Sequence, residues 1–251
     1  MKKIAVLLGI LLLCILTGCD SAPEQAAPAE TANFTLQSVD TESIAPLRYW
    51  LYTPTEPTEE MPLVVYLHGR SGMGDDPNVL IKTDGFPQYL RDGRLGDVRA
   101  YVAIPQLPSD RDGWMREDDA ILSLIEELVR KCGIDRENVA LTGHSMGGAG
   151  TWAIAGVHPA AFARIAPISG GVRDIEEAAV RLKNIPIRAF VGELDRVVPP
   201  ESSVELVERI RELGGDAEVT VLEGTDHRGT LCEAYLGEDF RLIDWLIGQS
   251  R

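Results

Sequence analysis

The chain has 251 residues and carries 39 acidic against 24 basic side chains, which gives a formal net charge of −15 at pH 7. Such an acidic surface disfavours nucleic acid and other polyanions as partners, whereas it leaves a neutral polymer or a small ester open. Hydrophobic residues make up 45% of the chain, and its length suffices for one domain of the larger α/β kind.

The first 18 residues have the pattern of a secretory leader. Two lysines precede thirteen mostly apolar residues, 4–16, which are too few to span a bilayer as a stable helix. Leu16-Thr17-Gly18-Cys19 follows and resembles the lipobox of bacterial lipoproteins. This resemblance implies that residues 1–18 are a lipoprotein signal peptide and that Cys19 carries the lipid. The protein would then be anchored to a bacterial membrane in the cell envelope, facing the periplasm or the exterior. An ordinary signal peptide with an incidental cysteine is the alternative.

Residues 19–33 are predicted to be the lipidated cysteine and a flexible tether. The segment after the cysteine, DSAPEQAAPAETAN, has no aromatic side chain and no apolar periodicity, so it offers too little hydrophobic surface to fold. Residues 34–251 show neither a second shift in composition nor an internal repeat. We therefore expect a single folded domain over residues 34–251.

The folded domain alternates between strand and helix patterns. Two segments of alternating polarity come first and could pair as antiparallel strands, and a continuous apolar run typical of a strand buried on both faces follows. The predicted strands are Phe34–Asp40, Leu47–Thr53, Leu63–Leu67, Val98–Ile104, Val139–Thr142, Arg164–Ile168, Ile187–Val191 and Ala217–Leu222. The predicted helices are Glu117–Lys131, Gly147–Val157, Ile175–Leu182, Ser202–Leu213 and Glu233–Ile247. Such alternation requires crossover connections, so we expect an α/β fold with a mostly parallel eight-stranded sheet and helices on both faces.

Ser145 occupies the most informative motif of the chain, Gly143-His144-Ser145-Met146-Gly147. The motif lies between a predicted strand and a predicted helix, so the chain must turn sharply at the serine. Glycines two residues before and two after make this turn sterically possible and lift the hydroxyl clear of the backbone. The motif in this context resembles the nucleophile elbow of the α/β-hydrolases, which implies that Ser145 is a catalytic nucleophile.

The resemblance extends over nearly all of the folded domain and implies a chain order of nucleophile, acid and histidine. Of the four histidines, only His227 meets this order, in a predicted loop after the last strand and before the last helix. Asp195 is the preferred acid because it follows a predicted strand, as does the acid loop of the family. Glu193 and Asp226 remain rivals for this role.

An oxyanion hole needs two fixed hydrogen-bond donors. The backbone N–H of Met146, at the start of a predicted helix, is the expected first donor. The loop His68-Gly69-Arg70-Ser71-Gly72 resembles the His-Gly-x-x-Gly loop of the family, which implies that the N–H of Arg70 is the second. His68 is then expected to be a structural residue. Trp114 could line the pocket or pack in the core, and Arg228 could contact a substrate carboxylate or remain solvated.

The wider pattern is most similar to the phospholipase/carboxylesterase and polyhydroxybutyrate-depolymerase-like branch, some members of which are labelled predicted peptidases. Only about fifteen residues separate Gly171 from Pro186, so we expect a minimal lid. The resemblance implies a serine carboxylesterase that cleaves short-acyl or polymer-linked esters through an acyl-enzyme. The alternatives are a serine peptidase of the prolyl-oligopeptidase type and a lipid-anchored binding protein on a hydrolase scaffold. No cofactor, no metal site and no disulfide between Cys132 and Cys232 are expected.

Overall fold

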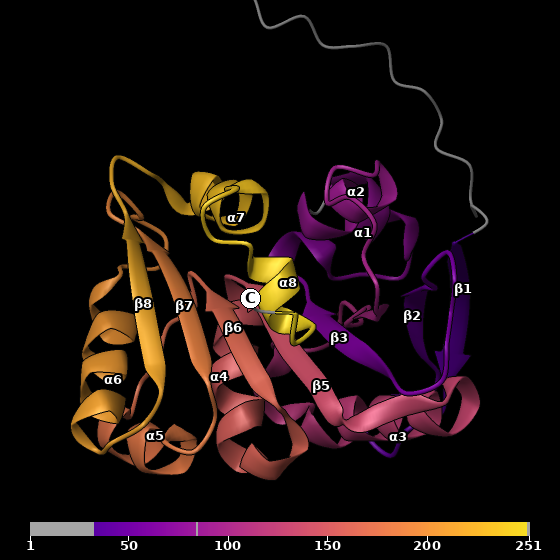
Figure 1. Cartoon of the computed structure of the whole chain (residues 1–251), viewed down its shortest axis with the longest axis horizontal. Coiled ribbons are helices and arrows are strands. Elements are labelled where there is room, and N and C mark those ends of the chain that lie inside the picture. The colour runs from indigo at the N-terminus through magenta and orange to yellow at the C-terminus, as the bar shows by residue number, and fades with distance from the viewer. Residues whose placement is uncertain (1–32, 84, 250–251) are drawn as a thin grey trace, which may run out of the picture.

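The computed structural model describes residues 33–83 and 85–249, so the predicted signal peptide and the tether up to residue 32 lie outside this part. The described residues form an eight-stranded sheet in the order β1-β2-β4-β3-β5-β6-β7-β8 (Figure 1). The strands are β1 (Phe34–Val39), β2 (Leu47–Tyr52), β3 (Met61–Leu67), β4 (Tyr101–Pro105), β5 (Ile134–His144), β6 (Arg164–Ile168), β7 (Ile187–Gly192) and β8 (Ala217–Leu222). The helices are α1 (Asn78–Thr83), α2 (Gly85–Arg91), α3 (Asp118–Cys132), α4 (Met146–Val157), α5 (Ile175–Leu182), α6 (Glu201–Glu212), α7 (His227–Leu236) and α8 (Leu242–Leu246).

The strand pairing confirms the expected mostly parallel sheet. β1 pairs antiparallel with β2, and β2 pairs antiparallel with β4. All the remaining neighbours, from β4 through β3 and β5 to β8, pair in parallel. The carboxyl ends of these parallel strands therefore share one edge of the sheet, and the loops that leave them can meet there.

Both faces of the sheet are covered by helices, as the continuous apolar run of β3 predicts. Leu63, Val65 and Leu67 join a hydrophobic cluster with α3, α4, α5 and α6. Val64 and Tyr66 point to the opposite face and join a second cluster with α1, α2, α7 and α8. Figure 1 shows the two groups of helices as separate layers. Side chains of β3 are thus buried on both faces, which requires the run to be apolar at every position.

Two helices between β3 and β4, α1 and α2, are absent from the sequence prediction. They have six and seven residues, and α2 contains Pro87 in its first turn. Segments this short do not complete the two turns that a helical periodicity needs to become visible. Their apolar side chains instead pack on the sheet, where Phe86 stacks on Tyr66 at 4.7 Å.

The prediction of one last helix over Glu233–Ile247 is wrong. The chain forms α7 over His227–Leu236, and after a break it forms α8 over Leu242–Leu246. The Asp226 side chain accepts a hydrogen bond from the N–H of Gly229 at 2.8 Å, and this cap starts the helix earlier than expected. At Gly237 an added Cβ would lie 2.6 Å from the carbonyl oxygen of Glu233, so the chain leaves the helix at a residue without a side chain.

The segment between β6 and β7 is short, as expected. It contains the single eight-residue helix α5, so the described chain has no large cap over the carboxyl edge of the sheet at this point. Both described cysteines, Cys132 and Cys232, are free thiols. Within residues 33–83 and 85–249, no helix combines the length and the apolar character that crossing a membrane requires.

Candidate active site

Ser145 sits in a strained turn between β5 and α4. Its backbone angles are φ 59° and ψ −115°, which a residue with a side chain rarely adopts. An added Cβ at Gly147 would lie 1.8 Å from the carbonyl oxygen of Leu67. An added Cβ at Gly143 would lie 2.7 Å from the carbonyl carbon of Gly147. The two glycines that the sequence analysis singled out are therefore needed because the backbone of β3, β5 and α4 meets here without room for side chains.

A chain of hydrogen bonds joins the serine to the two other residues predicted to act with it. His227 Nε2 lies 2.9 Å from Ser145 Oγ, and His227 Nδ1 lies 2.7 Å from Asp195 Oδ2. The side chain of Asp195 is fully buried, whereas that of His227 is 19% exposed. The three residues follow β5, β7 and β8 in the chain, and the topology brings them together at the carboxyl edge of the sheet.

The carboxylate of Asp195 is held in its ionised form. Burial by itself favours the neutral acid, yet hydrogen bonds from the N–H of Val198, from His227 and from the N–H of Val197 lower the pKa of Asp195 below its ordinary value. Both backbone donors lie 2.9 Å from Oδ1, which leaves Oδ2 for the imidazole. Because an ionised Oδ2 only accepts, His227 donates from Nδ1, and its Nε2 then faces the serine as an acceptor.

The two rival carboxylates lie elsewhere. Glu193 accepts a hydrogen bond from the N–H of Gly224 at 2.8 Å, and Asp226 caps α7. The structure thus brings Asp195, and neither rival, to the imidazole. His227 itself is the first residue of α7 rather than a loop residue, which corrects the sequence prediction about its setting.

His144, inside the serine turn, makes a contact that the sequence analysis did not foresee. Its ring lies 4.6 Å from that of His227, and its Nε2 lies 2.9 Å from the carbonyl oxygen of His227. Burial, reinforced by the charge of His227, lowers the pKa of His144 to about 4. His144 is therefore neutral near pH 7, and its Nε2–H donates to the carbonyl. The sequence could have pointed to His144 only through its position directly before the serine. Sequence alone does not say which partner the ring of His144 contacts.

The expected oxyanion donors lie at the starts of two helical segments. Met146 is the first residue of α4, and Arg70 is the first residue of a short 3₁₀ helix over Arg70–Gly72. First-turn N–H groups have no acceptor within their own helix, so both are available to a ligand. The loops are also adjacent, since an added Cβ at Gly69 would lie 3.6 Å from the Cβ of Ser145.

His68 supports this loop from behind. Its Nε2 accepts a hydrogen bond from the N–H of Leu107 at 3.0 Å, and its Nδ1 lies 2.6 Å from the carbonyl oxygen of Gly69. Burial lowers the pKa of His68 to about 4, so the ring is a neutral tautomer with the proton on Nδ1. Trp114 is fully buried and donates its indole N–H to the carbonyl oxygen of His68 at 3.0 Å. Both residues are structural supports of the loop.

The hydroxyl of Ser145 opens into a cleft of about 770 Å³. The cleft is bounded by the 68–72 loop, by α1 and α2, and by the start of α7. Its described lining residues are Gly69, Arg70, Ser71, Lys82, Thr83, Gly85, Gln88, Tyr89, His144, Ser145, Val197, His227, Arg228 and Leu231. Arg228 thus borders the cleft and is exposed. Among the described residues, no group of three or more His, Cys, Asp or Glu side chains could hold a metal ion.

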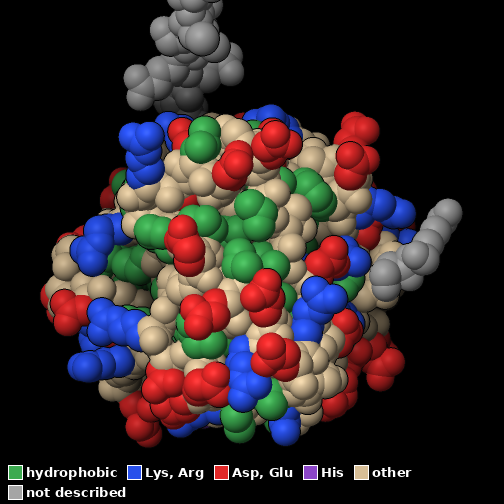
Figure 2. Space-filling model, turned by 90° about the vertical axis from the view of Figure 1, so that its left-hand side faces the viewer, with side chains coloured by type: hydrophobic (Ala, Val, Ile, Leu, Met, Phe, Trp, Pro, Cys, Tyr) green, Lys and Arg blue, Asp and Glu red, His purple; other side chains and the backbone are tan. Residues whose placement is uncertain are grey.

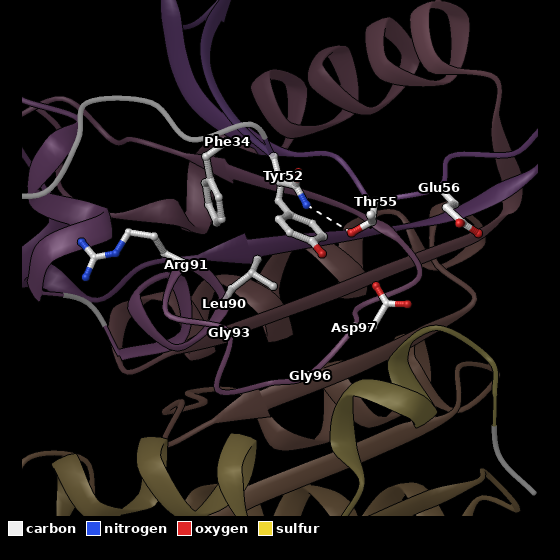
Figure 3. Close-up of a pocket in the computed structure, with 10 residues that line it drawn as sticks. Phe34, Tyr52, Thr55, Glu56, Leu90, Arg91, Gly93, Gly96 and Asp97 are labelled. Carbon is white, nitrogen blue, oxygen red and sulfur yellow. Dashed lines mark hydrogen bonds between the residues drawn. The ribbon is translucent and has the colours of Figure 1, made fainter.

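Figure 3 shows a second hollow, of about 610 Å³, which does not include the serine among its lining residues. Tyr52, which lines it, pairs with Val102 near the amino end of β4, whereas Ser145 follows the carboxyl end of β5. In a parallel sheet these two ends lie at opposite edges. Its described lining is Asn33, Phe34, Tyr52, Thr55, Glu56, Leu90, Arg91, Gly93, Gly96 and Asp97, without a serine, cysteine or histidine. The cleft beside Ser145 is therefore the candidate active site.

Comparison with known proteins places this geometry among hydrolases. A family model described as phospholipase/carboxylesterase matches residues 100–234. A thermostable esterase of known structure has 30% sequence identity and a TM-score of 0.72, covering 87% of this chain and 64% of its own. The chain thus spans less than two thirds of that esterase. No curated protein sequence matches.

Two more distant structures share the fold alone. A feruloyl esterase module from Clostridium thermocellum in complex with sinapinate has 14% identity and a TM-score of 0.63, covering 86% of both chains. A dipeptidyl peptidase 4 from Porphyromonas gingivalis has 12% identity and a TM-score of 0.68, covering 86% of this chain and 35% of its own. Esterases and peptidases both use this architecture, so the fold does not separate the two activities.

Proposed function

Because the chain belongs to the phospholipase/carboxylesterase family of hydrolases, with the α/β-hydrolase fold, we propose that it is a serine carboxylesterase. The observation that carries this proposal is the hydrogen-bonded chain from Ser145 through His227 to the buried carboxylate of Asp195. A serine hydroxyl is a poor nucleophile at its ordinary pKa, and a histidine acceptor within 3 Å supplies the base that it needs.

In the first half of the proposed reaction, Ser145 Oγ attacks the ester carbonyl carbon while His227 Nε2 takes the hydroxyl proton. The carbonyl oxygen becomes an oxyanion, which the N–H groups of Met146 and Arg70 stabilise. Asp195 stabilises the imidazolium that forms and keeps the proton on Nδ1. The intermediate collapses when the bond to the alcohol oxygen breaks, and this oxygen leaves with the proton from His227 Nε2.

In the second half, water resolves the acyl-enzyme. His227 Nε2 takes a proton from the water as its oxygen attacks the acyl carbon, and a second oxyanion forms in the same hole. Collapse returns the proton to Ser145 Oγ and releases the carboxylic acid. The same groups therefore serve both halves, with His227 alternating between base and acid.

The short segment between β6 and β7 supports substrates that do not need a large apolar cap. We propose short-acyl esters, or esters attached to a neutral polymer, as the substrate class. The lipobox-like sequence around Cys19 further supports a location in the bacterial cell envelope, with the enzyme held to a membrane by lipid. Cys19 lies outside the described residues, so this part of the proposal rests on sequence.

Turnover of short p-nitrophenyl esters tests the assignment. The purified protein is expected to hydrolyse them and to be labelled by a fluorophosphonate, and Ser145→Ala should abolish both. Ser123→Ala, in helix α3 away from the cleft, is the matched control. It should retain both ester turnover and fluorophosphonate labelling. Ester turnover that survives in Ser145→Ala would remove the serine from the mechanism. Peptide amides tested in parallel distinguish an esterase from a peptidase, since faster turnover of the amides would favour the peptidase.

A further inference from the structure

Three positively charged side chains, Arg70, Lys82 and Arg228, line the cleft that holds Ser145. None of the described lining residues is acidic. Asp84 lies between two lining residues but outside the described part, and even a full negative charge there would leave the cleft positive. Resting on the proposed esterase function, we propose that the preferred ester carries one carboxylate, bound by these cations while Ser145 attacks the ester carbonyl.

The cleft stands out because three cations gather in it without an acidic lining residue among those described. On the face formed by α5, α6 and β8, positive and negative side chains are interspersed (Figure 2). Arg209, for example, bridges Glu176 and Glu212, and Arg188 pairs with Glu218. By contrast, among the described residues Arg70, Lys82 and Arg228 form no ion pair within 4.0 Å. No described carboxylate is paired with these three side chains, so each can act on a ligand in the cleft.

The three cations line the cleft from separate elements. Arg70 belongs to the 68–72 loop next to Ser145, Lys82 lies in the last turn of α1, and Arg228 follows His227 at the start of α7. Tyr89 adds a hydroxyl to the same wall. Burial and a hydrogen bond with Cys232 raise the pKa of Tyr89 to about 12, so this hydroxyl stays neutral near pH 7 and adds no negative charge to the cleft. A carboxylate in the cleft thus meets three cations and a neutral hydroxyl.

The charge of the whole protein limits the ligand to a small anion. A net charge of −15 repels polyanions at long range, and the repulsion grows with each negative charge on the ligand. A single carboxylate is repelled least, and the cations of the cleft act on it at short range, where solvent screens them less. Long-range repulsion by the whole protein and short-range attraction by the cations of the cleft together favour a monoanionic ester over both a neutral ester and a polyanion.

Two pairs of esters test the inference and locate the carboxylate. Monomethyl glutarate carries it on the acyl half, and butanoyloxyacetic acid carries it on the alcohol half. Each is compared with its primary amide, which has nearly the same shape and no charge, and acid release is followed by pH-stat. In at least one pair, we expect kcat/KM to be about ten-fold higher for the carboxylate, and this ratio should shrink as NaCl is raised.

Variants then assign the preference to the cleft. Lys82→Gln and Arg228→Gln should each lower the carboxylate-to-amide ratio of kcat/KM by about three-fold or more, and the double variant should lower it further. Lys183→Gln, which removes an exposed cation at the far end of α5, should leave the ratio unchanged. A wild-type ratio of one or less in both pairs, or an equal loss in the Lys183 variant, would overturn the inference.

A binding measurement separates this inference from the esterase assignment. Ser145→Ala protein, which should not turn the ester over, is titrated calorimetrically with monomethyl glutarate, butanoyloxyacetic acid and the two amides. Tighter binding of at least one acid than of its amide, lost in the Lys82→Gln/Arg228→Gln background, supports the carboxylate site even without any turnover. Equal or weaker binding of both acids contradicts it, whether or not the wild-type protein hydrolyses neutral esters.

Discussion

His144 and His227 connect the serine turn directly to the segment that supplies the proposed base, because the Nε2–H of His144 donates to the carbonyl oxygen of His227 at 2.9 Å. The residue before the nucleophile thus fixes the backbone from which the second imidazole projects. A shift of α7 along its axis would have to break this bond before it could separate Nε2 of His227 from Ser145.

Replacement of His144 by Phe keeps a planar ring but leaves the carbonyl of His227 without this donor. Because the carbonyl of His227 still accepts within α7, the loss is that of one hydrogen bond, about 0.5–1.5 kcal/mol, and we expect kcat/KM on a short ester to fall by about two- to ten-fold. His144→Gln retains an amide donor and should recover part of the loss. The rate of fluorophosphonate labelling of Ser145 provides the second readout. Labelling at the wild-type rate in His144→Phe would show that the bond does not position the base.

Asp195→Asn tests how the tautomer of His227 is set. With its oxygen facing the N–H groups of Val197 and Val198, the asparagine would present its NH₂ to Nδ1 of His227. The imidazole would then carry its proton on Nε2, where it cannot accept the proton of Ser145. We expect kcat to fall on the order of 10³–10⁴-fold in a folded protein.

Glu193→Gln is the matched control for this substitution, because Glu193 is a rival carboxylate in the same loop and bonds the N–H of Gly224. It should retain activity within a factor of about two, since its partner lies outside the serine–histidine chain. Steady-state kinetics measures kcat for both variants, and circular dichroism checks that both are folded. A larger loss of kcat in Glu193→Gln than in Asp195→Asn would reverse the assignment of the acid.

The two buried histidines predict how stability depends on pH. His68 and His144 have pKa values of about 4 in the folded protein, against about 6.5 in an unfolded chain. Above pH 6.5 both states are neutral and the histidines contribute no pH dependence. Between pH 6.5 and 4 the unfolded chain binds protons that the folded protein does not, so the free energy of unfolding falls as pH falls.

Each histidine accounts for a loss on the order of 3 kcal/mol by pH 4. Urea unfolding at about pH 7.5, 6.5, 5.5 and 4.5, in even steps of about one pH unit, measures the slope. In His144→Phe the slope should be smaller by about one proton, because the unfolded state loses one titrating ring. The same slope in wild type and variant would mean that His144 is not buried as a neutral ring.

Two glycines of α4 should respond in opposite ways to alanine. At Gly147 the new methyl group would lie 1.8 Å from the carbonyl oxygen of Leu67, so the serine turn could not form without moving β3 or α4. We expect a loss of about 3 kcal/mol or more in unfolding free energy, together with loss of activity. At Gly156 an added Cβ meets nothing within 4 Å, so Gly156→Ala should stabilise the helix by about 0.5–1 kcal/mol.

The proposed lipid anchor makes a separate prediction. In a bacterial host, Cys19→Ala should move the protein from the membrane fraction to the soluble fraction, because the thiol that carries the lipid is gone. Ester turnover by the released protein should match that of the wild type, since Cys19 is not among the described residues that line the cleft. Wild-type protein already found in the soluble fraction would contradict the anchor and favour an ordinary signal peptide.

Sequence alone predicted most of the sheet and the meeting of Ser145, Asp195 and His227. Strands such as Leu63–Leu67 are readable because burial on both faces requires apolar residues throughout, and the order of parallel strands then brings their carboxyl ends together. The sequence already favoured Asp195, but coordinates were needed to set aside its rival Asp226. An aspartate before a helix can face its neighbour or cap the helix, and only the contact with the N–H of Gly229 decides.

The parts that escaped prediction are those in which tertiary contacts dominate a short segment. Helices α1 and α2 are too short for a periodicity to show, yet they supply Lys82 and Tyr89 to the cleft. The orientation of His144 depends on where α7 begins, which in turn depends on the cap at Asp226. Charge composition predicted repulsion of polyanions, but not that three cations would gather beside the serine.

The serine, the aspartate and the histidine all come from the half of the chain that begins with β5, whereas Lys82 and Tyr89 come from α1 and α2 between β3 and β4. The residues proposed to cleave the ester bond and several residues proposed to select the substrate thus come from different segments of the chain. An insertion or exchange confined to α1 and α2 can alter selectivity while β5 to β8 hold the reacting atoms in register. This division makes the α1–α2 segment the natural place at which to graft a new specificity onto the same chemistry.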